Sequence, residues 1–259
     1  MALTNKTIAS TYGDILQADN SGSGRTANGT TIKDGLGQST ALTLGQNKLH
    51  VKPSSDQTDA MIVETSGGTD LLKVDTTNSA VKLGTTQSYA NTQIQRFTIL
   101  DHQPTADTHH VMFIDGVVYI GVTPLALGTS TDPATTYTLG SSENNANALV
   151  MSSWYIPVAI TIDEVRVIAS GEASDSVNFH LYSYTMASGT GADAGDLSSG
   201  TLLAHNGSTL TTGNDRVTTT TLTIDSANVA ADKVVLAFIE NVGATTDLTA
   251  QLIVKYHYQ

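Results

Sequence analysis

The chain has no cysteine, no long apolar run and few charged residues, and each shortage excludes a class of protein. Without cysteine there is no disulfide framework, thiolate metal site or cysteine nucleophile, so stability must come from packing and association. Charged residues make up 14% of the chain, and the abundant Thr, Ser, Gly and Asn disfavour helices and suit strands joined by turns. The sequence therefore predicts an all-β protein.

Other absences bear on partners and location. No stretch approaches the ~20 apolar residues that span a bilayer, which argues against membrane insertion. Residues 1–10 lack the basic-then-apolar layout of a signal peptide, so we expect the protein to be made in a cytoplasm and to stay soluble. The formal net charge is -12 and the 12 Lys and Arg are scattered, which argues against nucleic acid binding because that rests on neutralising phosphates.

The first 87 residues fall into two regions. Residues 1–39 hold a short apolar patch and a Gly/Ser/Asn-rich run, and are predicted to form an extended arm that is flexible or ordered by a partner. Residues 40–87 carry apolar runs spaced about ten residues apart and separated by turn residues, at 41–44, 49–51, 61–63, 71–74 and 80–83.

Each of these short runs puts aliphatic side chains on one face of a strand, as Leu72 with Val74 and Val81 with Leu83 illustrate. One chain buries little with such strands, whereas several copies around a common axis would bury the aliphatics together. Residues 40–87 are therefore predicted to form a short intertwined β stem. The alternative is an ordinary meander packed on the C-terminal domain.

The rest of the chain has longer strand patterns. Residues 88–144 are predicted to be a small β element or linker, and residues 145–259 an antiparallel β-sandwich knob of jelly-roll type. An Asp115-Gly116 turn is expected to join two strands into a hairpin. Strands are expected at 96–100, 111–114, 117–122, 154–168, 176–184, 216–224, 233–241 and 249–258.

The segment Leu71–Gly84 resembles a stem element of tail-fibre and head-fibre proteins of tailed bacteriophages, especially marine ones. The preceding Asp59–Asp70 is similar to the partner strand of that element, while Thr7–Asn20 and Lys33–Leu42 resemble the virion-anchoring start of the same proteins. The likeness covers roughly the first third of the chain. It implies a homotrimer that is made in the host cytoplasm, lies exposed on the virion, and carries a distal knob.

The resemblance also sets the expected partners. The arm is expected to bind other virion proteins of the capsid or tail, and the knob to meet a host surface receptor or glycan. The rival hypotheses are a capsid decoration or cement protein, a glycan-binding or glycan-cleaving fibre, and a monomeric carbohydrate-binding module whose arm is dispensable.

The search for chemistry predicts no enzyme and no cofactor. The run Gly24–Thr30 lacks the Lys of a phosphate-binding loop, no Gly-x-Ser-x-Gly elbow occurs, and adjacent Asp163 and Glu164 would point to opposite faces of a strand. Asp107, His109 and His110 are weak metal-ligand candidates, since alternate strand positions share a face, but a polar loop is the preferred interpretation.

Aromatic residues give no assigned receptor site. Trp154 and Tyr155 indicate a packed strand edge rather than a sugar-binding platform. The alternating pairs Tyr182/Tyr184 and Tyr256/Tyr258 are expected at a subunit interface or in packing rather than in receptor contact.

Three bulky apolar residues stand out in the polar arm: Tyr12, Ile15 and Leu16. We expect them to fill pockets on the particle, because buried apolar anchors dominate binding energy. Replacing both Ile15 and Leu16 by Asp should leave a folded trimer that no longer enters particles, as gel analysis of purified virions would show. Normal incorporation would contradict the anchor assignment.

Overall fold

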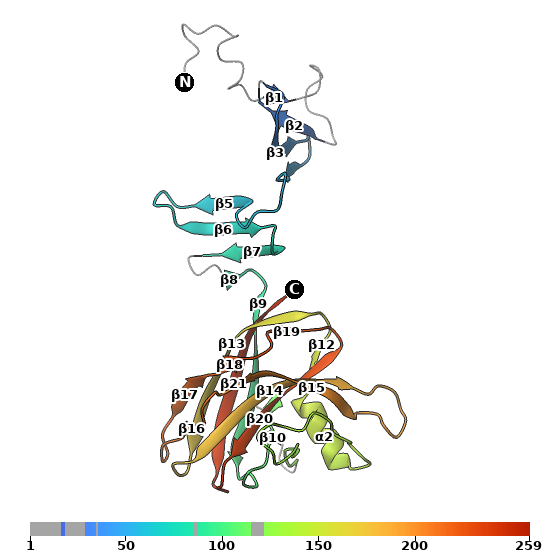
Figure 1. The fold of residues 1–259 in the computed structure, drawn as a ribbon, viewed down its shortest axis with the longest axis vertical. Helices are drawn as coiled ribbons and strands as arrows, with labels where there is room; N and C mark the ends of the chain where they lie inside the picture. Colours follow the sequence, from blue (N-terminus) through green and yellow to red (C-terminus); the bar gives the residue numbers. More distant parts are fainter. Residues whose placement is uncertain (1–16, 19–28, 35, 85–87, 115–121) are drawn as a thin grey trace. The chain divides into compact units, whose positions relative to one another are not determined.

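The computed structural model describes residues 17–18, 29–34, 36–84, 88–114 and 122–259. Strands account for 52% of the residues and helix for 5%, and the sheets are antiparallel, which confirms the predicted all-β class. The chain divides into two compact units, Met1–Ala90 and Asn91–Gln259 (Figure 1). Each unit is described by itself below.

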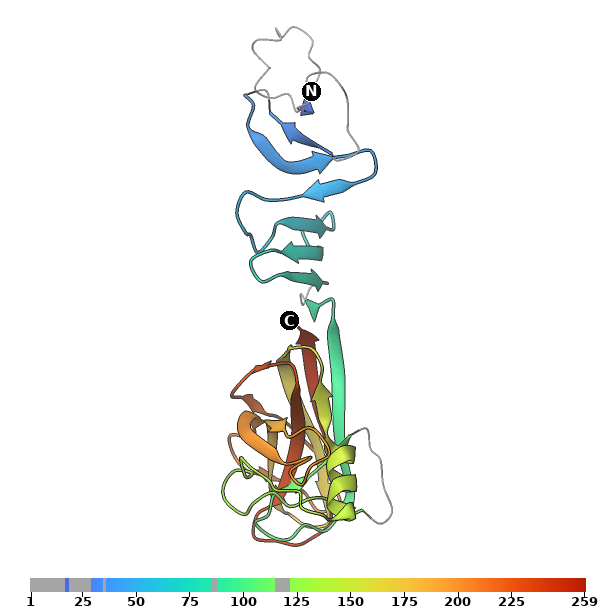
Figure 2. The ribbon, with the colours of Figure 1, turned by 90° about the vertical axis from the view of Figure 1, so that its right-hand side faces the viewer.

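The first unit contains two four-stranded sheets whose strands follow chain order (Figure 2). The apolar runs predicted between residues 41 and 83 all lie within strands, so these predictions are confirmed. The predicted boundary between residues 39 and 40 falls inside a strand, because pairing begins at Ser39. One sheet consists of β1 (Gln17–Ala18), β2 (Thr30–Lys33), β3 (Ser39–Leu44) and β4 (Leu49–Val51), and the other of β5 (Met61–Glu64), β6 (Asp70–Asp75), β7 (Ala80–Leu83) and β8 (Ser88–Tyr89).

Local turn chemistry closes the hairpins of the second of these sheets. Between β5 and β6, Gly68 adopts a φ of 78°, which a residue without a Cβ accommodates readily, and its N–H donates to the Thr65 carbonyl at 3.0 Å. Between β6 and β7, the Asp75 carboxylate accepts a hydrogen bond from the Asn78 N–H at 2.9 Å. Both turns were expected from their residues.

The second unit contains a six-stranded and a seven-stranded sheet. The six-stranded sheet has the order β11 (Phe113–Ile114), β9 (Thr92–His102), β21 (Leu248–Tyr258), β13 (Ile160–Gly171), β17 (Thr218–Thr221), with β19 (Asn228–Val229) also paired to β13. The seven-stranded sheet has the order β10 (His110–Val111), β20 (Lys233–Asn241), β14 (Ser176–Met186), β15 (Leu197–His205), β18 (Thr223–Ile224), with β12 (Trp154–Ile156) paired to β20 and β16 (Leu210–Thr211) paired to β14.

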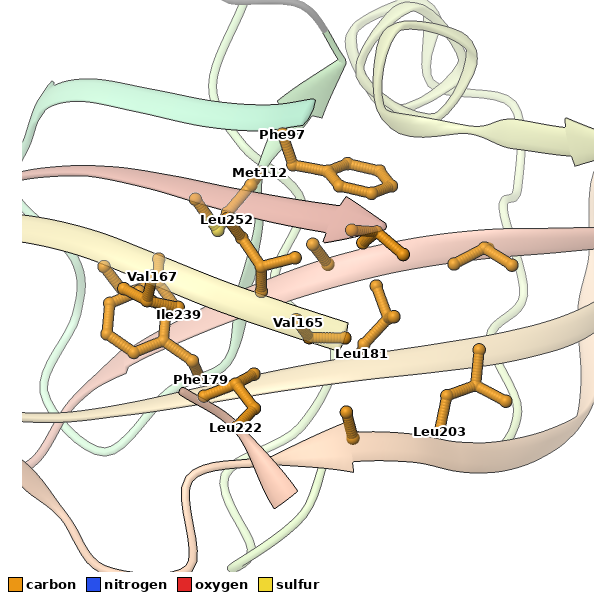
Figure 3. Packing of buried hydrophobic residues seen from close by; sticks show 14 of the residues in the cluster. Phe97, Met112, Val165, Val167, Phe179, Leu181, Leu203, Leu222, Ile239 and Leu252 are labelled. Atoms are coloured by element: carbon orange, nitrogen blue, oxygen red, sulfur yellow. The ribbon is translucent and has the colours of Figure 1, made fainter. Parts of the chain in front are cut away.

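The inward side chains of both sheets meet in one apolar cluster (Figure 3). Phe97 and Leu252 come from the six-stranded sheet and Phe179 and Ile239 from the seven-stranded sheet, and all four are buried. The two-residue period that predicted strand 249–258 is confirmed, since its alternate residues enter this core. Core burial of this extent is the main stabilising term of the unit.

A second apolar cluster covers the opposite side of the seven-stranded sheet. Tyr182 and Tyr184 of β14 pack there with Leu125, Leu127 and the helix α2 (Glu143–Ser152). This side of 176–184 is not open to water, because residues from 122–139 and α2 form a covering layer. Gly200 permits the close approach: a Cβ there would meet Thr135 and Tyr184 at 2.7 Å.

Several predicted strands are each divided into two shorter strands that belong to different sheets. The run 111–114 splits, because β10 pairs with β20 while β11 pairs with β9. The run 216–224 splits likewise into β17 and β18 of different sheets. Residues 91–144 share the compact unit of 145–259, so the predicted boundary at 145 lies within one unit. The expected Asp115-Gly116 turn lies outside the described residues.

The buried Phe179 side chain provides a test of the shared core. Phe179→Ala should lower the free energy of unfolding of the second unit by about 3–5 kcal/mol, because it removes a large buried ring and leaves a cavity. Urea unfolding followed by the fluorescence of Trp154, the single tryptophan, would measure this change. Thr219→Ala, at an exposed position of β17, should change it by less than about 0.5 kcal/mol. Equal effects of the two substitutions would contradict the assigned core.

Candidate functional site

One face of the β5-β6-β7 sheet in the first unit is entirely aliphatic. Cross-strand register places Met61 beside Val74 and Val74 beside Val81, and the next row is made by Val63, Leu72 and Leu83. These six residues are called the aliphatic face. Four of them remain substantially exposed within the chain: Met61 at 40%, Val63 at 43%, Val81 at 42% and Leu83 at 47%. The face is therefore an uncovered apolar surface in the described part of the first unit.

The opposite face of the same sheet, called the polar face, carries paired charges beside the partly exposed Ile62. Lys73 Nζ lies 2.8 Å from Asp70 Oδ2, and Lys82 Nζ lies 3.1 Å from Asp75 Oδ2. Hydrogen bonds from the Asn78 side chain and backbone, with a smaller contribution from Lys82, lower the pKa of Asp75 to about 2. This sheet thus exposes aliphatic side chains on one face and carries ion pairs on the other.

The predicted metal candidates of the second unit do not converge. Asp107 Oδ1 accepts from the Gly243 N–H at 2.8 Å, His109 Nε2 lies 2.8 Å from the Ser130 carbonyl, and His110 Nε2 accepts from the Thr105 N–H at 3.2 Å. Among the described residues, no group of three or more His, Asp or Glu is placed to hold a metal ion. Asp107 and His109 lie in the loop before β10, as the preferred interpretation predicts, whereas His110 begins β10; both histidines are buried.

The two histidines instead belong to a set of five neighbouring imidazoles, called the imidazole row, that sequence reasoning missed; His109, His110 and His180 are buried, while His102 and His205 are half-buried. The His109 ring lies 4.9 Å from that of His180, which stacks at 6.3 Å on His205, and the His102 ring lies 4.9 Å from that of His110. His180 and His205 face each other across the β14-β15 register. Nothing in the sequence signals this row, because its members come from separate elements brought together only by strand pairing.

Burial controls the charge of this row. Desolvation, and to a smaller extent the neighbouring imidazole, lowers the pKa of His180 and of His102 to about 4. Asp132, whose Oδ1 lies 3.6 Å from His180 Nε2, opposes the shift only in part. His205 Nδ1 is 2.8 Å from Asp225 Oδ2. His180 and His102 are therefore neutral at pH 7.

An acidic hollow of about 290 Å³ lies at one end of the six-stranded sheet. Its lining includes Asp101 near the end of β9, Glu172 after β13 and Asp247 before β21, together with Asp215. Asp101 and Asp215 have φ values of 47° and 50°. The hollow gathers negative charge, and it contains none of the sequence-predicted metal candidates.

Some of the aromatic residues singled out from the sequence are packed in the fold, and others are exposed. The Trp154 ring packs against Phe97 at 6.3 Å and Tyr256 at 4.8 Å, which confirms its place in the packing of a strand. Tyr182 and Tyr184 are buried, while Tyr155 and Tyr258 keep substantial exposure. The predicted anchors Tyr12, Ile15 and Leu16 lie outside the described residues.

Comparisons with known proteins give no family assignment. No family model and no curated protein matches the chain. A solved structure of the infectious bursal disease virus Gt strain is similar at 11% sequence identity and a TM-score of 0.15, over 65% of this chain and 62% of that chain. A TM-score this low carries no argument about fold or function. No helix in the described ranges is long and apolar enough to cross a membrane.

The imidazole row predicts acid sensitivity of the second unit. The unfolded chain takes up a proton at His180 below pH 6.5 but the folded chain only near pH 4, so stability falls as pH drops through this window. His180→Phe, which stays neutral, should remove up to about 3 kcal/mol of that loss. Urea unfolding at pH 7, 6, 5 and 4, followed by Trp154 fluorescence, measures it.

His50→Phe is the matched control, because His50 lies at an exposed position of β4 in the first unit. It should leave the pH dependence of the second unit unchanged. Identical pH profiles for the wild type and His180→Phe would contradict the role given to the buried imidazole.

Proposed function

We propose that this protein is a structural, non-enzymatic fibre of a virus particle that works as a homotrimer. Residues 1–39 form the arm that binds capsid or tail proteins, residues 40–87 form an intertwined stem, and the second unit is a jelly-roll-like knob for host attachment. The likeness of residues 59–84 to phage fibre stem elements supports this proposal at the level of sequence.

The observation that carries the proposal is the uncovered aliphatic face. Completing the burial of a half-exposed Val, Leu or Met is worth on the order of 1 kcal/mol, so the four exposed residues of the face in each copy supply a substantial driving force for association. In the first unit, Ala80 is the one hydrophobic residue that is buried among those described. Such a unit gains its apolar core by packing against copies of itself.

The register of the strands favours copies arranged about an axis. The aliphatic face is two residues deep along each strand and three strands wide, so it forms a narrow apolar patch. Three such patches facing inward make a closed core, with the polar face carrying Lys73 and Lys82 outward. The polar side chains are already paired within the chain, so this arrangement buries no unpaired charge.

The proposed mechanism is multivalent display. Three knobs on one stem raise the effective concentration of each knob near a surface, so weak contacts at single knobs combine into firm attachment. The proposal assigns no metal ion to Asp107, His109 and His110, because these side chains bond to separate backbone groups.

Charge placed on the aliphatic face should dissociate the oligomer. Val63→Lys combined with Leu83→Lys puts two ammonium groups into the proposed core, where burial of unpaired charge is strongly unfavourable. Light scattering should give three times the 27.1 kDa chain mass for the wild type and a lower mass, toward that of one chain, for this variant.

Ile62→Lys is the matched control, because Ile62 lies on the polar face of the same strand, beside Lys73. We expect it to retain the wild-type mass. A wild-type protein of single-chain mass at all accessible concentrations would contradict the stem.

A further inference from the structure

The outer face of the six-stranded sheet has a regular composition. Strand register places Ile94, Lys255 and Glu164 in one row, Arg96, Ile253 and Arg166 in the next, and Thr98, Gln251 and Ile168 in a third. These nine residues of β9, β21 and β13 are called the mixed face. The inward neighbours of the same strands fill the shared core, so the nine side chains point away from it.

The mixed face is open within the chain. Ile94 is 61% exposed, and the Arg166 side chain is 67% exposed even though it pairs with Glu164. The seven-stranded sheet differs, because the second apolar cluster covers its outer side. Within the described ranges, the second unit therefore has one covered sheet and one sheet whose central strands expose aliphatic and cationic side chains.

The charge of this face is opposite to that of its surroundings. Residues 91–259 contain five Lys and Arg against sixteen Asp and Glu, a formal charge of -11. Three of the five cations, Arg96, Arg166 and Lys255, lie on the mixed face, whereas only one of the sixteen acids, Glu164, does. A second copy of this unit presents an anionic surface almost everywhere else.

We propose that the mixed face is the contact through which the second unit packs on a second copy of itself. A ring of three copies needs two different surfaces on each copy, and a cationic face meeting an anionic neighbour supplies them. Interleaved aliphatic and Arg side chains suit a protein interface, whereas small-molecule sites are concave. This inference rests on the proposed homotrimer.

The short chain segment that joins the first unit to the second supports the mixed-face contact, and this argument does not depend on the angle between the two units. Ile94 follows Ala90 by four residues, a span of at most ~14 Å in an extended chain. Association of the first units therefore holds the β9 strands of different copies near one another. The high effective concentration lets a modest surface form a contact that free units would not maintain.

Thiol reactivity in the full chain tests this inference, because the protein has no cysteine of its own. Gln251→Cys places one thiol on the central strand of the mixed face, at a position exposed within the chain. Val150→Cys, at a 75% exposed position of α2, is the matched control. We expect Gln251→Cys to react with a thiol reagent at least tenfold more slowly than Val150→Cys.

Charge reversal completes the test. Adding Arg96→Glu and Arg166→Glu to the Gln251→Cys protein should raise its reaction rate toward that of Val150→Cys, while Arg216→Glu, an exposed cation off the face, should not. Circular dichroism checks that each variant stays folded. Light scattering on the same samples gives the mass of the oligomer, so a failure of the mixed-face contact can be distinguished from a failure of the proposed homotrimer.

A trimeric mass together with a rapidly reacting thiol in the Gln251→Cys protein would overturn the mixed-face contact and leave the trimer standing, with the face free for another partner. A single-chain mass would overturn both proposals. A slow thiol in a single chain would also overturn the contact, because the protection would then come from within one copy.

Discussion

The proposed homotrimer depends on one constraint, the exposure of the aliphatic face. No other residue in the described part of the first unit covers this face. Met61, Val63 and Leu83 lie on one face of a sheet whose other face carries two ion pairs, and folding of one chain leaves these three residues in contact with water. The second unit does not share this constraint, because two sheets and a covering layer bury its apolar residues in two clusters. The same chain therefore combines a unit that is complete in one copy with a unit that is not.

Sequence periodicity predicted those parts of the fold that depend on neighbouring residues. The strand 233–241 has the predicted bounds, and the alternate burial along β21 follows from the two-residue period. The short strands of the first unit were predicted for the same reason, since turn residues separate them. In each case the determining signal lies within about ten residues.

What sequence reasoning missed depends on distant contacts. Helix α2 contains two asparagines near its start, and it is stabilised by Ser142 at its N-cap and by burial of Ala148 and Leu149. Strand β15 was not among the predicted strands; Gly200 interrupts its pattern and allows a close approach to Thr135. The imidazole row is invisible for a similar reason: His180 and His205 are 25 residues apart and meet only through β14-β15 pairing.

Two weak surfaces on one chain reinforce each other when a short link joins them. The aliphatic face loses water-exposed apolar area on association, and this gain is insensitive to salt. The mixed face depends in part on Arg96, Arg166 and Lys255, whose attraction to an anionic neighbour is screened by salt. Once the first units have associated, the second contact no longer bears the entropy cost of bringing copies together. In the proposed homotrimer, we therefore expect assembly to run from the apolar stem to the charged face, so that the stem decides whether the second contact forms at all.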